Sequence, residues 1–376
     1  MKNVGFAIGL ASAVGFAGAG LSLSTAGAAD MKQWWPVKVE AWNPSCANGD
    51  AKCWADPANA IGKRKIVDYV PLPKAEKKWN ICASFPHLKD SYWVGADYGI
   101  IEEAKRLGVK LTLVEAGGYT NLPKQISQIE DCVAGGAQAV VIGSISLDGL
   151  NKTVEALHAK KIPVIDVING ISSPEISAKS LVSFKEMGFN AGAYIAKQHP
   201  KGSGKVQVAW FPGPPGAGWV EAGNQGFLDA VKNSDIEVVD TKYGDTGKEV
   251  QLKLVEDSLQ AHPNIAYIVG TSPTTEAAVQ LLRERGLSDK IKVLAYYFTP
   301  GVYQDIKRGR VMAAPTDSAV VQGRVAIDQA VRILEGKPYM KHVGPKIYVI
   351  DKSNIDSFDY ASSLAPEDWK PVFNVN

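Results

Sequence analysis

Charge of one sign, cysteine and histidine are all scarce in this 376-residue chain. Its 41 Lys and Arg residues almost balance 39 Asp and Glu residues, and it has four cysteines and five histidines. A net charge of +2 leaves no basic stripe of the kind that binds nucleic acid or an acidic membrane surface, so neither is expected as a partner. With 45% hydrophobic residues the chain can bury ordinary cores, and its length predicts about two domains.

A long apolar run is also missing, except at the N-terminus. Residues 1–28 begin with Lys2, continue through a Gly/Ala/Ser-rich apolar stretch and end in Ala26-Gly27-Ala28. These three parts are typical of a secretory signal peptide. A membrane anchor is the alternative, but a Leu-rich span and a following cationic cluster are both missing. We therefore predict an exported, soluble, periplasmic protein that lacks its first 28 residues.

Export makes disulfides the expected state of the four cysteines, because they persist in oxidising compartments. Three pairings are possible. The favoured pairs are Cys46–Cys53, which would close a short polar loop, and Cys82–Cys132, which would join a predicted strand to a predicted helix. A zinc site is the weaker alternative, since no Cys-x-x-Cys spacing occurs and no histidine clusters beside the cysteines.

From residue 79 onward, short apolar runs alternate with amphipathic stretches. Strands separated by helices of this length predict βαβ units and parallel sheets covered on both faces. The pattern occurs in two sets, which predicts an α/β fold with two doubly wound, Rossmann-like lobes. Strands are expected at 79–85, 110–116, 139–143, 163–167, 205–211, 236–243, 266–270 and 292–296, and helices at 91–107, 122–135, 150–160, 189–198, 220–232, 249–261 and 274–285.

Residues 29–76 do not follow this rhythm and contain Trp34, Trp35, Trp42 and Trp54. We expect an irregular arm that packs its tryptophans on a lobe or presents them to a partner. Packing is favoured, because a tryptophan normally supplies a large buried area.

Aromatic side chains gather where the predicted strands end. Doubly wound sheets bind their ligands beyond the carboxyl ends of the strands, so these positions predict a cleft. The residues at or near these strand ends include the aromatics Tyr92, Trp93, Tyr119, Phe184 and Tyr297 and the polar residues Asp90 and Asn169. Asp90 also precedes a predicted helix, where an N-cap is the alternative role.

Motifs of catalysis are missing. The sequence has no Gly-x-Ser-x-Gly elbow, Walker loop, His-Glu-x-x-His or dinucleotide-binding glycine motif. The loop at 212–216 has glycines, but its prolines remove backbone donors that a phosphate would need. His87 lies at a strand end without an evident catalytic partner, which favours a structural role. We expect a protein that is not an enzyme and has no cofactor or metal.

Three segments resemble a known family: residues 88–93 (LKDSYW), 115–119 (EAGGY) and 303–312 (YQDIKRGRVM). They are similar to the TorT family of periplasmic sensors of trimethylamine N-oxide (TMAO), in the type I periplasmic binding superfamily that includes ribose-binding proteins. The resemblance extends from Trp79 to Phe373. It implies binding of TMAO or a similar methylated amine between two lobes, and docking on the periplasmic domain of a TorS-like sensor histidine kinase.

At matching positions the resemblance implies Tyr92, Trp93, Tyr119 and Tyr297 as ligand residues, whereas Phe184 stands at or beside a family tryptophan. Phenylalanine keeps the π face but loses the indole N–H donor. Physical chemistry agrees with such a set. A methylated ammonium cannot donate a hydrogen bond, so aromatic faces recognise it, at about 0.5–2 kcal/mol each.

The superfamily also implies three chain crossings between the lobes and a ligand that shifts the population of lobe arrangements. We place the crossings near 169–171, 298–301 and 316–318. The predicted domains are an N-terminal lobe of 77–169 and 299–317, a C-terminal lobe of 170–298 and 318–350, and a tail of 351–376 packed on the lobes.

The alternative function is the receptor of an ABC transporter for a sugar or another small polar solute. Such a receptor predicts bidentate hydrogen-bonding residues at strand ends. Asn169 and Asp317 fit this pattern, but no arginine occurs at the strand ends considered.

Overall fold

The computed structural model describes residues 35–42 and 64–376. The predicted signal peptide and the predicted Cys46–Cys53 pair lie outside these ranges, as do Trp34 and Trp54. Within the described ranges no helix combines the length and the apolarity needed to cross a bilayer.

The larger sheet has nine strands in the order β15-β4-β3-β5-β6-β7-β13-β1-β2. Its strands are β1 (Val37–Trp42), β2 (Arg64–Tyr69), β3 (Asn80–Phe85), β4 (Lys110–Glu115), β5 (Ala139–Ile142), β6 (Val164–Val167), β7 (Ala178–Ser180), β13 (His342–Pro345) and β15 (Asn374–Val375). The six strands from β4 to β13 run parallel. Both β5 and β6 are buried along their whole length, as expected for a sheet covered on both faces.

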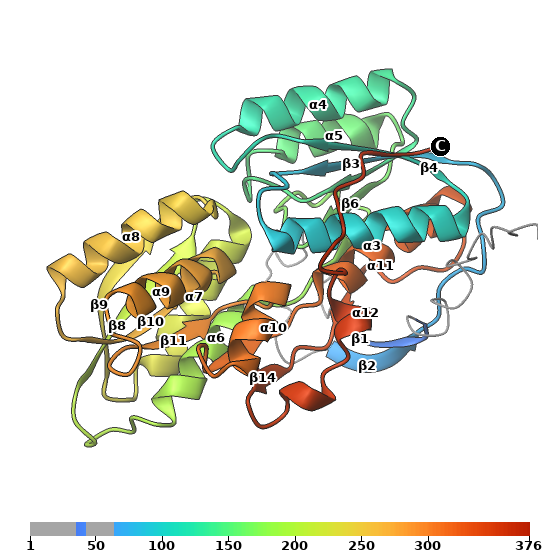
Figure 1. Ribbon diagram of the computed structural model, residues 1–376. Coiled ribbons are helices and arrows are strands. Elements are labelled where there is room, and N and C mark those ends of the chain that lie inside the picture. The colour runs from blue at the N-terminus through green and yellow to red at the C-terminus, as the bar shows by residue number, and fades with distance from the viewer. Residues whose placement is uncertain (1–34, 43–63) are drawn as a thin grey trace, which may run out of the picture. The chain divides into compact units, whose positions relative to one another are not determined.

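Figure 1 shows four helices against this sheet, with α3 and α11 on one face and α4 and α5 on the other. Their bounds are α3 (Ser91–Leu107), α4 (Leu122–Ala134), α5 (Asn151–Ala159) and α11 (Ala319–Leu334). Helices α3 and α11 pack closely because Gly99 of α3 lies against the backbone of Val320, where a β-carbon would not fit.

The smaller sheet has four strands in the order β11-β10-β8-β9. Its strands are β8 (Val206–Gly213), β9 (Ile236–Tyr243), β10 (Ile265–Gly270) and β11 (Lys292–Ala295), and its helices are α6 (Phe184–Ala196), α7 (Gly218–Val231), α8 (Lys248–Ala261), α9 (Ser272–Glu284) and α10 (Pro300–Lys307). The remaining elements are β12 (Ala313–Pro315), β14 (Val349–Asp351), η2 (Ile355–Ser357) and α12 (Tyr360–Ser363). The two sheets share one strand order, because β4-β3-β5-β6 of the larger sheet corresponds to β9-β8-β10-β11 of the smaller. In each set the strand that comes first along the chain, β3 or β8, lies between two others. The ligand side of each sheet is therefore the carboxyl end of its strands.

The predicted α/β fold with parallel sheets is confirmed, and most predicted elements end within two residues of the observed ones. The main difference is α6, which starts at Phe184 instead of residue 189. Ser183 caps this helix by accepting a hydrogen bond from the Glu186 N–H. The earlier start places Phe184 in the first turn, at the cavity described below.

The prediction of an irregular arm is wrong for two segments. Strands β1 and β2 form an antiparallel pair, and β1 also pairs with β13, which extends the larger sheet. Trp42 is buried and its ring lies 4.9 Å from that of His342, which agrees with packing on a lobe. The sequence pattern of β1 and β2 is too short to be distinctive, and their pairing depends on β13, about 300 residues away in the chain.

The chain passes between the two sheets at three places before its C-terminal tail, which then returns to the larger sheet at β15. The first lies at 181–183, between β7 in the larger sheet and α6 beside the smaller one. The second is at 316–318, between β12 and α11, and the third is at 346–348, between β13 and β14. Thr316 and Tyr348 join the last two crossings through hydrogen bonds of 2.7 and 3.1 Å.

These positions correct two of the predicted crossings. Residues 169–171 precede β7, which still pairs within the larger sheet, and residues 298–301 lead into α10, which packs on α9. Helix α10 and strand β12 therefore lie with the smaller sheet, whereas α11 and β13 lie with the larger, the reverse of the predicted assignment. Apolar periodicity predicts that a helix has a buried face but not which sheet that face covers.

The predicted Cys82–Cys132 disulfide is present, with a Cα–Cα distance of 6.1 Å. It joins the middle of β3 to the last turn of α4. Nearby in the same sheet, the C-terminal strand β15 pairs with β4, and the Trp369 indole donates to Asp97 of α3 at 2.7 Å. The tail thus packs on the larger sheet and its helix.

Candidate functional site

A small cavity lies between the carboxyl ends of the two sheets. Ten residues line it: Asp90, Tyr92, Trp93, Tyr119, Ile168, Asn169, Phe184, Trp219, Thr246 and Tyr297. Its volume is only about 10 Å³, which is close to the minimum that holds one water molecule. Seven of the eight residues predicted from the sequence are thus brought together, and Asp317 lies just behind them.

Aromatic rings form most of the wall, and they come from both sheets. Tyr92, on α3, lies edge-on to Tyr297 at a centroid distance of 4.9 Å. Tyr119 faces Trp219 at 6.2 Å, and Trp219 lies 5.7 Å from Phe184. Such edge-on and tilted pairs are favourable for aromatic quadrupoles, so the rings support one another as well as the cavity.

The first turn of α3 positions Tyr92 and Trp93. Asp90 caps this helix, because its Oδ1 accepts the backbone N–H groups of Tyr92 and Trp93 at 3.1 Å each. Trp93 then packs on Phe85 at 4.7 Å and on Gly143, where a β-carbon would collide with the indole. Asp90 therefore has both roles considered for it: it is the N-cap and it lines the cavity.

Asn169 fixes the opposite wall. Its side-chain amide donates to the Tyr119 hydroxyl at 2.9 Å and to the Ser144 carbonyl at 2.7 Å. Burial raises the pKa of Tyr119 and the hydrogen bond from Asn169 opposes that shift, so the phenol stays protonated at neutral pH. The hydroxyl of Tyr119 is thus oriented and available as a donor.

Asp317 does not line the cavity but supports it from the crossing at 316–318. Its Oδ2 accepts a short hydrogen bond from the Tyr92 hydroxyl, and its carbonyl accepts one from Gln322 at 2.7 Å. Burial raises the pKa of Asp317 to about 7, although hydrogen bonds from Tyr92 and Gln322 act to lower it. Asp317 therefore connects the cavity wall to the crossing at 316–318.

We predict that Asp317 makes stability fall as pH rises from about 4 to about 7. The folded protein holds this proton more tightly than the unfolded chain, whose carboxyl titrates near 3.8. The stabilisation is complete below pH 4 and is lost through pH 7, with a slope of up to about 1.4 kcal/mol per pH unit. Urea unfolding of Asp317→Asn should lack this part of the slope, and the exposed Asp356→Asn should keep it. Equal slopes in the wild type and Asp317→Asn would contradict the prediction.

Sequence reasoning did not select Trp219 or Thr246 as ligand residues. Trp219 follows the glycine-rich loop after β8, at a strand end like the other candidates, so the same signal could have identified it. Trp219 lies beside Phe184. An indole is therefore present in the part of the wall where the resemblance had implied that phenylalanine replaces a tryptophan. The Trp219 Nε1 is buried and has no hydrogen-bond partner of normal geometry among the described residues.

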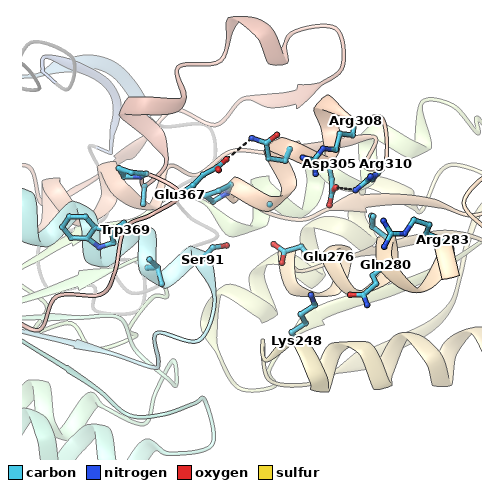
Figure 2. A pocket seen from close by; sticks show the side chains of 17 residues that line it. Ser91, Lys248, Glu276, Gln280, Arg283, Asp305, Arg308, Arg310, Glu367 and Trp369 are labelled. Atoms are coloured by element: carbon cyan, nitrogen blue, oxygen red, sulfur yellow. Dashed lines mark hydrogen bonds and ion pairs between the residues drawn. The ribbon is translucent and has the colours of Figure 1, made fainter.

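A second, more open groove lies outside the cavity, along α9, α10 and the tail (Figure 2). Its volume is about 480 Å³. Figure 2 shows mostly charged and polar side chains, including the Asp305–Arg310 pair at 3.5 Å and the Gln304–Glu367 bond at 3.0 Å. Trp369 is the only aromatic residue that lines it. The aromatic chemistry therefore belongs to the smaller cavity.

The described residues contain no cluster of three or more potential metal ligands. His87, interpreted from the sequence as structural, is buried behind the cavity and contacts Thr246. The site therefore offers a small cavity with aromatic faces, one carboxylate and a few hydrogen-bond donors.

The family profile described as "Periplasmic binding protein domain" matches residues 81–338. The periplasmic protein TorT of Escherichia coli (strain K12) is 37% identical over 303 residues, which cover 80% of this chain and 86% of TorT. A crystal structure of the TorS sensor domain–TorT complex in the presence of TMAO aligns at 36% identity with a TM-score of 0.71, covering 78% of this chain and 99% of that one.

A further solved structure is an ABC transporter solute-binding protein from Bradyrhizobium sp. BTAi1 with bound bis-tris. It is 62% identical to this chain, with a TM-score of 0.75, and covers 91% of this chain and 99% of that one. The relatives thus include both a sensor component and a transport component.

Proposed function

This chain belongs to the periplasmic binding protein family, and from that premise we propose that it binds TMAO or a similar small methylated amine in the periplasm and signals to a sensor histidine kinase. The observation that carries the proposal is the small cavity between the sheets, whose wall is mostly aromatic and comes from both of them. A ligand there holds the two lobes together, and a partner can recognise that arrangement.

The aromatic wall suits a methylated ammonium group. Such a group has no N–H to donate, and the faces of Tyr, Trp and Phe attract it through their quadrupoles, most strongly where water is excluded. The small volume also supports a compact solute. Because the space holds about one water, the wall must part for either ligand, but less for TMAO, with its few non-hydrogen atoms, than for a pentose.

Two polar groups suit the rest of such a ligand. The Trp219 N–H, which makes no hydrogen bond of normal geometry with the described residues, can donate to the oxygen of an N-oxide, and so can the Tyr119 hydroxyl. Asp90 places a carboxylate at the wall, where it complements a positive nitrogen. Among the ten lining residues there is no arginine, the side chain expected in a sugar receptor.

Signalling to a TorS-like kinase is supported by the likeness to TorT, which forms a complex with the TorS sensor domain. The second candidate is the receptor of an ABC transporter, which the 62% identical Bradyrhizobium protein favours. Its bound bis-tris combines a tertiary amine with several hydroxyl groups, so this relative does not favour a methylated amine over a polyol. The two candidates therefore differ in both the partner and the ligand class.

Calorimetric titration of the mature protein with TMAO, choline, glycine betaine and ribose tests the ligand class. We expect heat and a thermal shift from at least one methylated amine and none from ribose. Binding of ribose without binding of any methylated amine would contradict the proposal. Addition of a TorS sensor domain to the TMAO-loaded protein, followed by size-exclusion chromatography, tests the sensing role separately.

We predict that Asp90→Asn distinguishes a cationic ligand from a zwitterionic one. Asparagine keeps the N-cap acceptor for the Tyr92 and Trp93 N–H groups but removes the charge. Choline affinity should fall about 10- to 100-fold, as for loss of a charged partner, and TMAO affinity should fall less. Titration calorimetry gives both values, and an unchanged melting temperature confirms the cap. Equal affinities for choline in both proteins would remove Asp90 from the site.

A further inference from the structure

Two loops, one from each sheet, contact each other at one side of the cavity. Residues 86–90 connect β3 of the larger sheet to α3, and residues 244–247 connect β9 of the smaller sheet to α8. Their closest polar contact is His87 Nε2 to Thr246 Oγ1 at 2.9 Å, and both side chains are buried. Since Thr246 also lines the cavity, this contact lies directly beside the cavity.

The hydrogen bonds around His87 have a defined direction. The backbone N–H of Lys89 donates to His87 Nδ1 at 3.2 Å, so that nitrogen carries no proton and Nε2–H donates to Thr246. Burial raises the pKa of Asp90, and the nearby Thr246 hydroxyl acts to lower it. Burial lowers the pKa of His87, although Asp90 and Asp245 oppose the shift, and the ring is neutral at pH 7. The bond from His87 to Thr246 thus joins the first loop to the second.

Asp245 lies beside the same contact and pairs with Lys89. Lys89 Nζ lies 4.0 Å from Asp245 Oδ2, and His87 Nε2 lies 3.9 Å from the other oxygen of Asp245. Gly118, next to them, has a φ of +151°, and a β-carbon there would come within 2.8 Å of Asp245. A glycine at this position lets the second loop approach so closely.

We propose that His87 and Thr246 form an interlobe latch that holds the lobes closed and sets how long the ligand stays bound. The idea rests on the proposed function in one respect, that the ligand occupies the cavity between the lobes. The bond exists only while the lobes are closed, so it favours closure with or without a ligand and mainly slows dissociation. His87 and Thr246 act as positioning residues, since the latch works through the lobe arrangement.

Small-angle X-ray scattering of the ligand-free mature protein tests the latch without any ligand. Thr246→Val keeps the shape of the side chain but leaves the His87 N–H without its partner. This variant should show a larger radius of gyration than the wild type, whereas Thr246→Ser should restore the wild-type value. Thr112→Val, an exposed change on β4, is the matched control. An unchanged radius in Thr246→Val, or the same expansion in Thr246→Ser, would overturn the latch.

Stopped-flow dissociation of TMAO tests the lifetime. Thr246→Val should release TMAO roughly 10-fold faster with little change in the association rate, the effect expected for leaving buried polar groups unpaired. The double variant with His87→Leu should add little to either single variant, because both remove the same bond. Additive effects, or faster release without expansion in scattering, would overturn the proposal. If TMAO does not bind at all, the ligand assignment fails, and the scattering result still decides on the latch.

Discussion

Replacement of Trp219 by alanine should weaken TMAO binding by about 30- to 150-fold. The indole lies against the cavity beside Tyr119, Phe184 and Tyr297, and only 4% of it is exposed. Its loss removes a desolvated aromatic face, about 1–2 kcal/mol, and a hydrogen-bond donor to the N-oxide, about 1 kcal/mol. Together these amount to about 2–3 kcal/mol, where 1.4 kcal/mol corresponds to a tenfold change in Kd.

Titration calorimetry measures this change, and two further variants separate its causes. Trp219→Phe keeps an aromatic face but has no N–H, so it should weaken TMAO binding more than choline binding. Phe189→Ala changes an exposed aromatic side chain on α6, one helical turn and more from Phe184, and should leave Kd unchanged. If Trp219→Ala keeps its affinity for TMAO within threefold, Trp219 does not contact the ligand.

Removal of the Cys82–Cys132 disulfide should lower the free energy of unfolding by about 4 kcal/mol. The bond closes a loop with a sequence separation of 50 residues, and the chain-entropy estimate for such a loop gives this value. The melting temperature should fall by on the order of 10 °C. The double variant Cys82→Ala/Cys132→Ala avoids placing a hydroxyl at the fully buried position 82.

Urea unfolding, followed by circular dichroism, measures this effect. The wild type under reducing conditions should approach the stability of the double variant, which controls for the lost side-chain atoms. Ligand affinity should stay unchanged, since neither cysteine lines the cavity. A double variant as stable as the oxidised wild type would show that the disulfide adds nothing to folding.

Local signals in the sequence account for much of the agreement between prediction and structure. Helix α3 has the bounds predicted from its apolar periodicity, and local residues explain them: Asp90 is the N-cap and Gly108 ends the helix in the left-handed conformation. The strands β3, β5 and β6 are apolar runs bounded by turns, which is typical of parallel strands buried on both faces. These features depend on residues close together in the chain.

The candidate site was predictable to the extent that it follows from strand order. Ligand-side residues follow the carboxyl ends of parallel strands, which places Tyr92, Tyr119, Asn169 and Tyr297 at the cleft, and the family resemblance implies the three tyrosines as ligand residues. Asp317 was selected as a ligand residue, but it lies behind Tyr92 as a support. The position of Asp317 behind the cavity is set by the path of the chain at the crossing 316–318, and no sequence pattern predicts that path.

The sequence by itself therefore determined the α/β class, the bounds of most helices and strands, and the strand ends that line the cavity. Only the tertiary structure decided which sheet α11 and β13 join, that β1 and β2 extend the larger sheet, and that Trp219 completes the wall beside Phe184. The physical reason is the range of the interactions. Caps and apolar periodicity act within a few residues, whereas these pairings, and the contact of His87 with Thr246, join segments far apart in the chain.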